Sequence, residues 1–207
     1  METMQNLSLD RFTALLADKV SVPGGGGAAA LCGALAASLC SMAAVFTLGK
    51  KKFAEVEPQM SAAAEECGSI RRELLELIDR DAAAFEPLSR AYAIPKEDPD
   101  RPRVLEEATK AALAAPMDML RTCARAVPLM ELTAEKGTKM LISDAGCAAV
   151  LCRAAMECAY MNVLVNTRTL SDRLFALSLE NEAAALLHEC TRRCDAAADT
   201  VTKYLKG

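Results

Sequence analysis

The feature that most constrains the fold is a stretch without any charged residue, from Ala28 to Leu48, which directly follows four glycines, Gly24 to Gly27. A helix that is apolar on every side is a central one, because its whole circumference has to be covered by other elements. At a rise of about 1.5 Å per residue, a helix over this stretch is roughly 30 Å long. We therefore expect a long, buried helix at the centre of the molecule.

The composition indicates that the rest of the chain is helical as well. About forty of the 207 residues are alanine, the best helix former, while β-branched residues are sparse and Trp is absent. Hydrophobic residues make up 52% of the chain and charged residues 25%, which excludes general disorder. The expected fold is all-α, a single helical domain over residues 1–207 with a bundle of five to seven helices.

Hydrophobic periodicity and helix-capping residues predict where these helices lie. Their approximate ranges are 8–18, 28–48, 58–94, 103–133, 144–169 and 171–206. The range 58–94 fits one long helix or two consecutive ones, with a kink expected at Pro87. The four glycines are expected to form an irregular turn, and residues 95–102, rich in proline and charge, a surface loop.

Individual residues mark the expected starts and breaks of these helices. Ser8, Ser143 and Ser171-Asp172 are suitable N-caps for the helices that follow them. Proline cannot donate an intrahelical hydrogen bond, so we expect interruptions of the 103–133 region near Pro116 and Pro128.

Several classes of protein are disfavoured by charge and cysteine usage. A net charge of −4 with few aromatics argues against a dedicated nucleic-acid binder. The Ala28–Leu48 stretch is long enough to cross a bilayer, but it consists of Ala, Gly, Ser and Cys rather than Leu, Ile and Phe, so we expect no membrane contact. Nine cysteines without a CxxC pair, and a start unlike a signal peptide, favour the reducing cytoplasm.

The sequence offers no convincing metal site. His188 is the only histidine, and on a helix it points away from the shared face of Cys190 and Cys194. The Glu-x-x-His pairs of a di-iron bundle are also absent. We therefore expect no metal.

The glycine run is the first candidate for function. Glycines permit close approach of a ligand to bare backbone, and the helix that follows offers unpaired N–H groups and a positive dipole end. These features suit an anion, although the run matches neither GxGxxG nor the P-loop. A tight turn that lets helices pack is an equally good interpretation.

Asp81 is the second candidate. On a helix over 70–92 it lies among Leu77, Ile78 and Phe85, on a face that is otherwise apolar. Burial of a carboxylate raises its pKa toward the range useful for general acid–base catalysis. The alternative is a carboxylate that reaches solvent or pairs with an arginine.

Two further features have both a structural and a functional interpretation. One face of the 144–169 helix carries small residues between Asp144 and the pair Asn162 and Asn166, which leaves room for a ligand or allows close helix packing. The triplet Lys50–Lys52 follows the apolar helix, where cations are favourable at a helix C-terminus. The same triplet could cradle an anionic tail.

Five short motifs occur in an order that resembles a known family. They are Ser21-x-Pro23-Gly-Gly-Gly, Thr47-x-Gly49-Lys50-Lys51-Lys52-Phe53, Asp79-x-Asp81-x-x-x-Phe85 with Pro95 downstream, Ser143-Asp144, and Tyr160-x-Asn162-Val163-x-x-Asn166. Each motif is weak alone, but together they resemble the formimidoyltetrahydrofolate cyclodeaminase / methenyltetrahydrofolate cyclohydrolase family over about residues 8–205. One departure is Gly27, where the family usually has serine.

The resemblance implies an all-α protein that dimerises through long helices and binds a reduced folate in a cleft, with no permanently bound cofactor. It implies Asp81 as the catalytic general acid/base. It also implies a set of substrate-binding residues: Ser21, Pro23, Gly24, Gly25, Gly26, Lys50, Lys51, Asp144, Asn162 and Asn166. The amides of the 144–169 helix are expected to read the edge of the pterin.

The expected reaction is closure of 5-formimidoyltetrahydrofolate to 5,10-methenyltetrahydrofolate with release of ammonia. The alternatives are the 5,10-methenyltetrahydrofolate cyclohydrolase reaction, or a catalytically inactive helical interaction protein of the same fold. The length of the chain leaves no room for an attached formiminotransferase domain, so any such partner is expected to be a separate chain.

Overall fold

The computed structural model describes residues 3–207, so the first two residues of the expected domain lie outside the described part. The described residues form seven α-helices and three short 3-10 helices, without a β-strand. The α-helices are α1 (Leu9–Ala17), α2 (Gly25–Val45), α3 (Glu57–Tyr92), α4 (Arg101–Ala112), α5 (Ala114–Lys136), α6 (Ile142–Thr167) and α7 (Arg173–Lys206). The 3-10 helices are η1 (Met4–Asn6), η2 (Lys51–Phe53) and η3 (Lys139–Leu141). The all-α prediction is confirmed.

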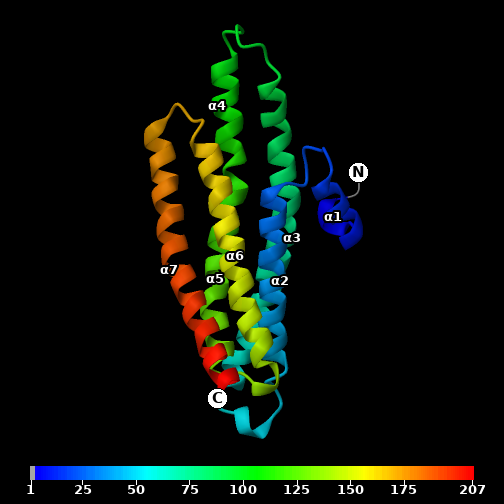
Figure 1. Ribbon diagram of the computed structural model, residues 1–207, viewed down its shortest axis with the longest axis vertical. Coiled ribbons are helices and arrows are strands. Elements are labelled where there is room, and N and C mark those ends of the chain that lie inside the picture. The colour runs from blue at the N-terminus through cyan, green and yellow to red at the C-terminus, as the bar shows by residue number, and fades with distance from the viewer. Residues whose placement is uncertain (1–2) are drawn as a thin grey trace.

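The long helices run up and down an elongated bundle (Figure 1). Helices α2, α5 and α7 run in one direction, and α3 and α6 run in the other. The end of α3 and the start of α4 form a hairpin that projects beyond the first turn of α2. The candidate site lies where α3, α4 and α6 meet the first turn of α2.

Helix α2 is the central helix that its charge-free sequence predicts, packed mainly against α6 and α3. Ala36, Ala37 and Cys40 are completely buried. A methyl group added at Gly33 would lie 3.0 Å from the Cys123 sulfur and 3.1 Å from a Leu74 methyl, so glycine is needed for this close approach. Small residues along α2 therefore let three helices pack tightly.

Two segments, Gly25–Val45 and Lys139–Thr167, are long and apolar enough to cross a membrane by length and composition alone. Half of the most apolar window of the first segment is buried inside the protein. The core helix of a globular bundle has the same properties, because its apolar surface packs on neighbouring helices.

The prediction that the glycine run lies outside regular structure is wrong for three of the four residues. Helix α2 begins at Gly25, and Gly24 is its N-cap in an extended conformation. Among the described residues only Gly49 and Gly207 have a positive φ. The glycines are thus needed because the absence of side chains leaves space beside α2, and not because they adopt an unusual backbone conformation.

The predicted interruption near Pro116 is confirmed, because helices α4 and α5 are divided at Leu113, three residues before it. The predicted interruption near Pro128 is wrong. Pro116 lies in the first turn of α5, where its missing N–H has no intrahelical partner to lose, and Pro128 lies within that helix. Helix α3 is one helix of 36 residues and includes Pro87.

The predicted caps have different outcomes. The side chain of Ser8 accepts a hydrogen bond from the Arg11 backbone N–H, and that of Asp172 accepts one from Phe175, so both N-caps are confirmed. Ser143 is not a cap, because α6 already begins at Ile142.

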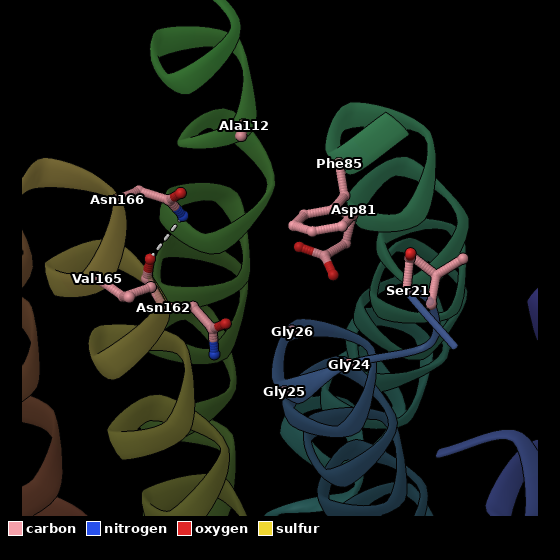
Figure 2. Close-up of a pocket in the computed structure, with 11 residues that line it drawn as sticks. Ser21, Gly24, Gly25, Gly26, Asp81, Phe85, Ala112, Asn162, Val165 and Asn166 are labelled. Atoms are coloured by element: carbon pink, nitrogen blue, oxygen red, sulfur yellow. Dashed lines mark hydrogen bonds between the residues drawn. The ribbon is translucent and has the colours of Figure 1, made fainter. Parts of the chain in front are cut away.

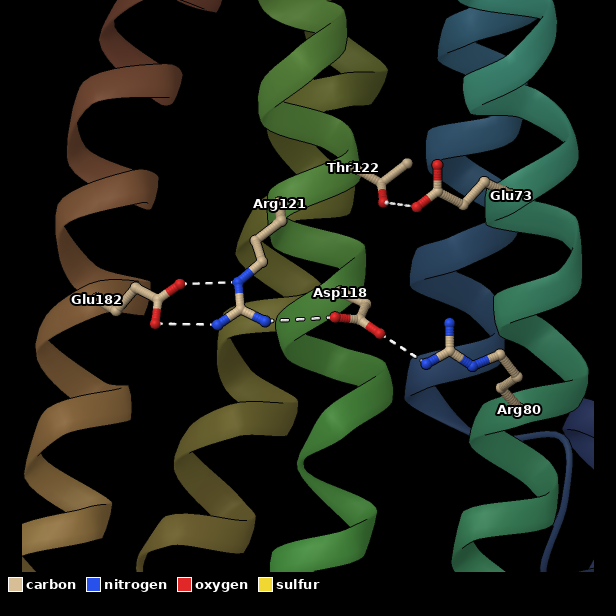
Figure 3. A network of polar contacts seen from close by, with 6 residues as sticks. All are labelled: Glu73, Arg80, Asp118, Arg121, Thr122 and Glu182. Carbon is tan, nitrogen blue, oxygen red and sulfur yellow. Dashed lines mark hydrogen bonds and ion pairs between the residues drawn. The ribbon is translucent and has the colours of Figure 1, made fainter.

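The face of the bundle made by α3, α5 and α7 is rich in ion pairs (Figure 3). Asp118 of α5 binds Arg80 of α3 at 2.6 Å and Arg121 at 3.3 Å, and Arg121 continues to Glu182 of α7 at 2.8 Å. Helices α2 and α6 lie behind these three helices. The bundle therefore has a polar face and, opposite it, a face formed by α2 and α6.

Candidate active site

A pocket of about 150 Å³ lies above the first turn of α2, between α3, α4 and α6 (Figure 2). It is lined by Ser21, Val22, Gly24, Gly25, Gly26, Asp81, Phe85, Ala112, Asn162, Val165 and Asn166. Seven of these, including Asp81 and both asparagines, are among the residues singled out from the sequence as catalytic or substrate-binding. The pocket is thus where the bundle brings most of the predicted residues together.

Asp81 is the ionisable residue in this lining. It follows the buried residues Leu77 and Ile78 by one helical turn, as the spacing predicts, and its carboxylate points toward the N-terminus of α2. Burial raises the pKa of this carboxyl above its usual range, while a hydrogen bond from the backbone N–H of Gly27 lowers it by less. A carboxyl placed in this way is protonated more readily than an exposed one, which suits it to both accept and donate a proton.

The glycines at the start of α2 make room for Asp81. A methyl group added at Gly26 would overlap the Asp81 carboxylate, far inside van der Waals distance. One added at Gly25 would lie 3.3 Å from the Asn162 amide nitrogen, and one at Gly24 would have no atom within 4 Å. Gly26 is therefore the position where bare backbone is indispensable to the site.

Asn162 and Asn166 approach the pocket from α6, across from Asp81. The amide nitrogen of Asn162 donates to the Cys158 carbonyl at 2.8 Å. That of Asn166 donates to the Asn162 carbonyl, also at 2.8 Å. Both side chains are thereby held in place by their own helix.

The loop before α2 contains two of the predicted site residues, and these two residues have different roles. Ser21 lines the pocket, whereas Pro23 is buried beneath it, after a cis peptide bond, and lies against Gly27. Pro23 therefore supports the start of α2 rather than facing the cavity.

Four lining residues were not predicted as site residues. Phe85 lies one turn after Asp81, with its ring beside the carboxylate, and the apolar periodicity of α3 had already placed it on that face. Val22 and Val165 are sequence neighbours of predicted residues. Ala112 comes from α4, and nothing in its sequence context marks it.

Lys50, Lys51 and Asp144 lie at the other end of the bundle. The two lysines follow the C-terminus of α2, and the Lys50 ammonium lies 3.5 Å from the Thr138 hydroxyl. Asp144 is in the first turn of α6, whose last turns carry the two asparagines. The 21 residues of α2 separate the two ends by about 30 Å. One chain alone therefore does not bring these three residues to the Asp81 pocket.

The small residues of α6 do not leave a free surface for a flat ring. Ala148, Ala155 and Ala159 are fully buried, and α6 makes its most extensive contacts with α2. The Cys32 thiol of α2 also donates to the Leu151 carbonyl of α6 at 3.3 Å. The expectation of space for a ligand along this face is wrong, and close helix packing is the correct interpretation.

Asp79, two residues before Asp81, faces a different part of the molecule. One carboxylate oxygen accepts a hydrogen bond from the Met4 backbone N–H, and the other is buried without a hydrogen-bond partner in the described structure. Asp79 therefore anchors the N-terminal segment, while Asp81 faces the pocket.

Within residues 3–207 no three His, Cys, Asp or Glu side chains are grouped as metal ligands. Cys190 and Cys194 are buried between helices as free thiols, like the buried cysteines elsewhere in the bundle. The site is therefore described by Asp81, two amides, a serine and bare backbone.

Comparison with known proteins identifies relatives over almost the whole chain. A methenyltetrahydrofolate cyclohydrolase from Methylorubrum extorquens is 39% identical over 89% of this chain and 90% of its own length. The formimidoyltransferase-cyclodeaminase of Rattus norvegicus is 29% identical over 91% of this chain, which spans 36% of that longer protein. The crystal structure of a formiminotetrahydrofolate cyclodeaminase from Thermotoga maritima superposes with a TM-score of 0.83 at 33% identity, covering 96% of this chain and 98% of that one.

The sequence profile of the formiminotransferase-cyclodeaminase family matches residues 8–185. This range contains α1 to α6 and every residue that lines the Asp81 pocket. The chain therefore belongs to the formiminotransferase-cyclodeaminase family.

Proposed function

We propose that this enzyme is a 5-formimidoyltetrahydrofolate cyclodeaminase, which forms 5,10-methenyltetrahydrofolate and ammonia with Asp81 as general acid/base. Family membership supports the coarser statement, that the chain is a folate one-carbon enzyme of the cyclodeaminase/cyclohydrolase type. The observation that carries the proposal is the partly buried Asp81 carboxyl, which has a raised pKa and lines a small pocket together with Asn162 and Asn166.

The reaction needs a group that moves one proton between two nitrogens. Attack of N10 on the carbon of the formimidoyl group, whose nitrogen is protonated, gives a tetrahedral carbon bonded to N5, to a protonated N10 and to an amino group. The Asp81 carboxylate takes the proton from N10 and returns it to the amino group, which leaves as ammonia, and the remaining positive charge is delocalised over N5, the carbon and N10 as an amidinium. Because burial raises the pKa of Asp81, the carboxyl can exchange this proton in both directions.

Pocket size fits a role at the reacting end of the substrate. About 150 Å³ is below the roughly 300–1,000 Å³ of pockets that enclose whole ligands, so the one-carbon unit enters while most of the folate lies outside. Holding N10 against the formimidoyl carbon there replaces a chance encounter with a fixed geometry, which lowers the activation barrier by several kcal/mol, up to about 11.

The second candidate is the methenyltetrahydrofolate cyclohydrolase reaction, favoured by the 39% identical relative of matching length. Water would add to the methenyl carbon, Asp81 would accept its proton, and opening of the ring would give 10-formyltetrahydrofolate. The two reactions share the ring carbon and the need for a proton shuttle, and they differ in the group that leaves or enters.

A homodimer would explain why the predicted residues occupy two ends of one chain. Helix α2 has no charged residue, and it exposes Leu35 and Val45, while the neighbouring α6 exposes Val150 and Met161. Two copies that pack this apolar face across a two-fold axis place opposite ends of α2 together. Each Asp81 pocket then lies near the partner's Lys50 and the partner's Lys51, which suit the carboxylates of a folate tail.

The nine free thiols support a reducing, cytoplasmic location, and the lining of the pocket requires no resident cofactor for the proposed proton transfer. A formiminotransferase on a separate chain remains the proposed source of the substrate.

The test is a near-ultraviolet assay of methenyltetrahydrofolate. Formation from 5-formimidoyltetrahydrofolate establishes the cyclodeaminase, and accelerated loss of added methenyltetrahydrofolate establishes the cyclohydrolase. Asp81→Asn should lower kcat by about 10²- to 10⁴-fold, the usual contribution of general acid–base catalysis.

Asp79→Asn is the matched control, because the same change two residues away faces the N-terminal segment and should leave kcat unaltered. No conversion of either folate by the wild-type protein would reject the proposal. Equal losses in both variants would reject the role of Asp81.

A further inference from the structure

The orientation of the side-chain amides of Asn162 and Asn166 indicates which kind of hydrogen-bonding group the ligand presents to them. The Asn162 nitrogen donates to the Cys158 carbonyl, and the Asn166 nitrogen donates to the Asn162 carbonyl. A backbone carbonyl can only accept, so these two bonds determine which end of each amide is the nitrogen. The two side-chain oxygens are left without a donor in the described structure.

These oxygens belong to side chains that face Asp81 across the pocket (Figure 2). Asp81, Asn162 and Asn166 together present acceptors, and Ser21 is the lining side chain that is free to donate as well. A group that lies against the two amide oxygens must therefore bring its own hydrogens, whereas the backbone N–H groups of Gly25 and Gly26 at the start of α2 can donate to an acceptor elsewhere in the pocket. A group that brings only lone pairs would leave the oxygens desolvated and unpaired, which is costly.

We propose that Asn162 and Asn166 determine specificity by accepting hydrogen bonds from the formimidoyl nitrogen, and so select a 5-formimidoyl over a 5-formyl substituent. The inference deepens the proposed function and rests on it. The two substituents have nearly the same size, but the formimidoyl group ends in N–H donors and the formyl group ends in an oxygen acceptor.

Polar matching of this kind discriminates far better than shape. A site built to bind an N–H or O–H group rejects an analogue that lacks it by a much larger factor than a site that only excludes one extra carbon. The pocket is too small to enclose a whole folate and so cannot select between the two folates by overall shape. It can select between them by the one-carbon group, which ends in a donor in one compound and in an acceptor in the other.

The location beside Asp81 also argues against the earlier expectation that these amides read the pterin edge. The two asparagines and Asp81 line one cavity of about 150 Å³. If the reacting carbon is near Asp81, the nitrogen bonded to that carbon reaches the asparagines, while the far edge of the pterin lies outside the cavity.

The experiment compares affinities for the two folates without turnover. Asp81→Asn protein serves as the background, and isothermal titration gives dissociation constants for 5-formimidoyltetrahydrofolate and for 5-formyltetrahydrofolate. Asn162→Leu and Asn166→Leu are then added separately. We expect each to weaken formimidoyl binding by roughly tenfold, the scale of a hydrogen bond to a charged group, and to leave formyl binding equal or tighter.

Asn162→Asp is the conservative variant, because aspartate has the same shape and keeps an acceptor. It should retain most of the preference for the formimidoyl compound, although it gives up the bond to the Cys158 carbonyl. Circular dichroism establishes that each variant keeps its helix content.

The ratio of the two affinities decides the question. A parallel loss for both folates in the leucine variants would overturn the inference, because pterin binding or a purely structural role predicts that result. An unchanged ratio would overturn it as well. Failure of the proposed function is a separate result: wild-type protein that does not convert 5-formimidoyltetrahydrofolate, whatever the ratio.

Discussion

The two ends of α2 show how one helix can offer two different kinds of polar site. Its N-terminal end is enclosed, with bare backbone at Gly25 and Gly26 facing the Asp81 carboxylate. Its C-terminal end passes through a turn at Gly49 into exposed lysines. Each end carries the charge that complements the helix dipole, a carboxylate at the start and cations at the finish.

The difference between the ends is enclosure. Burial raises the pKa of Asp81, and this perturbed carboxyl lies where water is partly excluded. Lys51 and Lys52 are exposed, and exposed charges are screened by salt and add little binding energy each. The comparison teaches that proton transfer belongs to the enclosed end, and that the exposed end is suited to attracting and holding an anion.

The largest effect on the enclosed end is expected from a substitution that fills the space beside Asp81. Gly26→Ala places a methyl group on the carboxylate, so Asp81 or the first turn of α2 must move. A small displacement of a catalytic group can cost about 100-fold, so we expect kcat to fall by roughly ten- to 100-fold. Steady-state kinetics with 5-formimidoyltetrahydrofolate measure this loss.

Gly24→Ala is the control for this substitution, since a methyl group there meets no atom within 4 Å. It should change kcat by less than about twofold, because the added methyl disturbs no lining side chain, and an N-cap alanine weakens a helix only modestly. If Gly24→Ala and Gly26→Ala lose the same activity, the glycine run acts through backbone flexibility and not through space for Asp81.

At the exposed end, removal of charge should affect binding and leave chemistry intact. The double variant Lys50→Ala/Lys51→Ala is expected to raise KM for the folate by about three- to tenfold at low salt, with kcat unchanged, since each exposed ion pair contributes up to about 1 kcal/mol. Lys52→Ala is the matched control, because the Lys52 ammonium lies 4.8 Å from the centroid of the Phe53 ring. Added salt should reduce the difference between variant and wild type.

The same lysines test whether two subunits share a site. Asp81→Asn protein mixed and refolded with Lys50→Ala/Lys51→Ala protein forms some mixed dimers, in which one of the two sites carries neither change. Activity of the mixture at low substrate should therefore exceed the average of the two variants measured separately, because the unchanged sites of the mixed dimers add about a quarter of wild-type activity. Activity equal to that average would show that Asp81 of one subunit and the lysines of the other do not act at one site.

Much of the fold can be predicted from the sequence because the strongest signals for it are properties averaged over many residues. Alanine content and the charge-free stretch indicate a helical bundle with α2 at its centre, and the apolar periodicity of α3 places Asp81 on a buried face. Local signals were less reliable. Pro128 is tolerated inside a helix, and Ser143 is not a cap, because packing against neighbouring helices outweighs the preference of single residues.

The site was predictable only in pieces. Spacing along one helix can place Asp81 and can align Asn162 with Asn166, but it cannot show that α2 starts between them. Nor can it find Ala112, whose contribution depends on how far α4 extends past α2. The separation of Lys50 from Asp81 likewise appears only when the direction and length of α2 are known.

The smallest expected effect is on the free energy of unfolding, whose dependence on pH should differ between variants at the two ends of α2. The folded protein raises the pKa of Asp81, so the folded state holds its proton to higher pH than the unfolded chain does. The free energy of unfolding therefore falls as pH rises from the unfolded pKa, near 3.9, through the folded one. Asn cannot ionise, so Asp81→Asn should be more stable than wild type above this window, by on the order of 1 kcal/mol, and equal to it below.

Urea unfolding of both proteins at a series of pH values from about 4 to 8 measures this difference. Lys50→Ala/Lys51→Ala should show no comparable rise in stability, because both lysines lie at the rim of the bundle, and Lys51 is exposed. If Asp81→Asn is instead less stable at neutral pH, the hydrogen bond from the Gly27 backbone to the carboxylate outweighs the cost of burial. The enclosed end would then stabilise the charged form of Asp81, and this carboxyl would lose the main reason for assigning it the proton transfer.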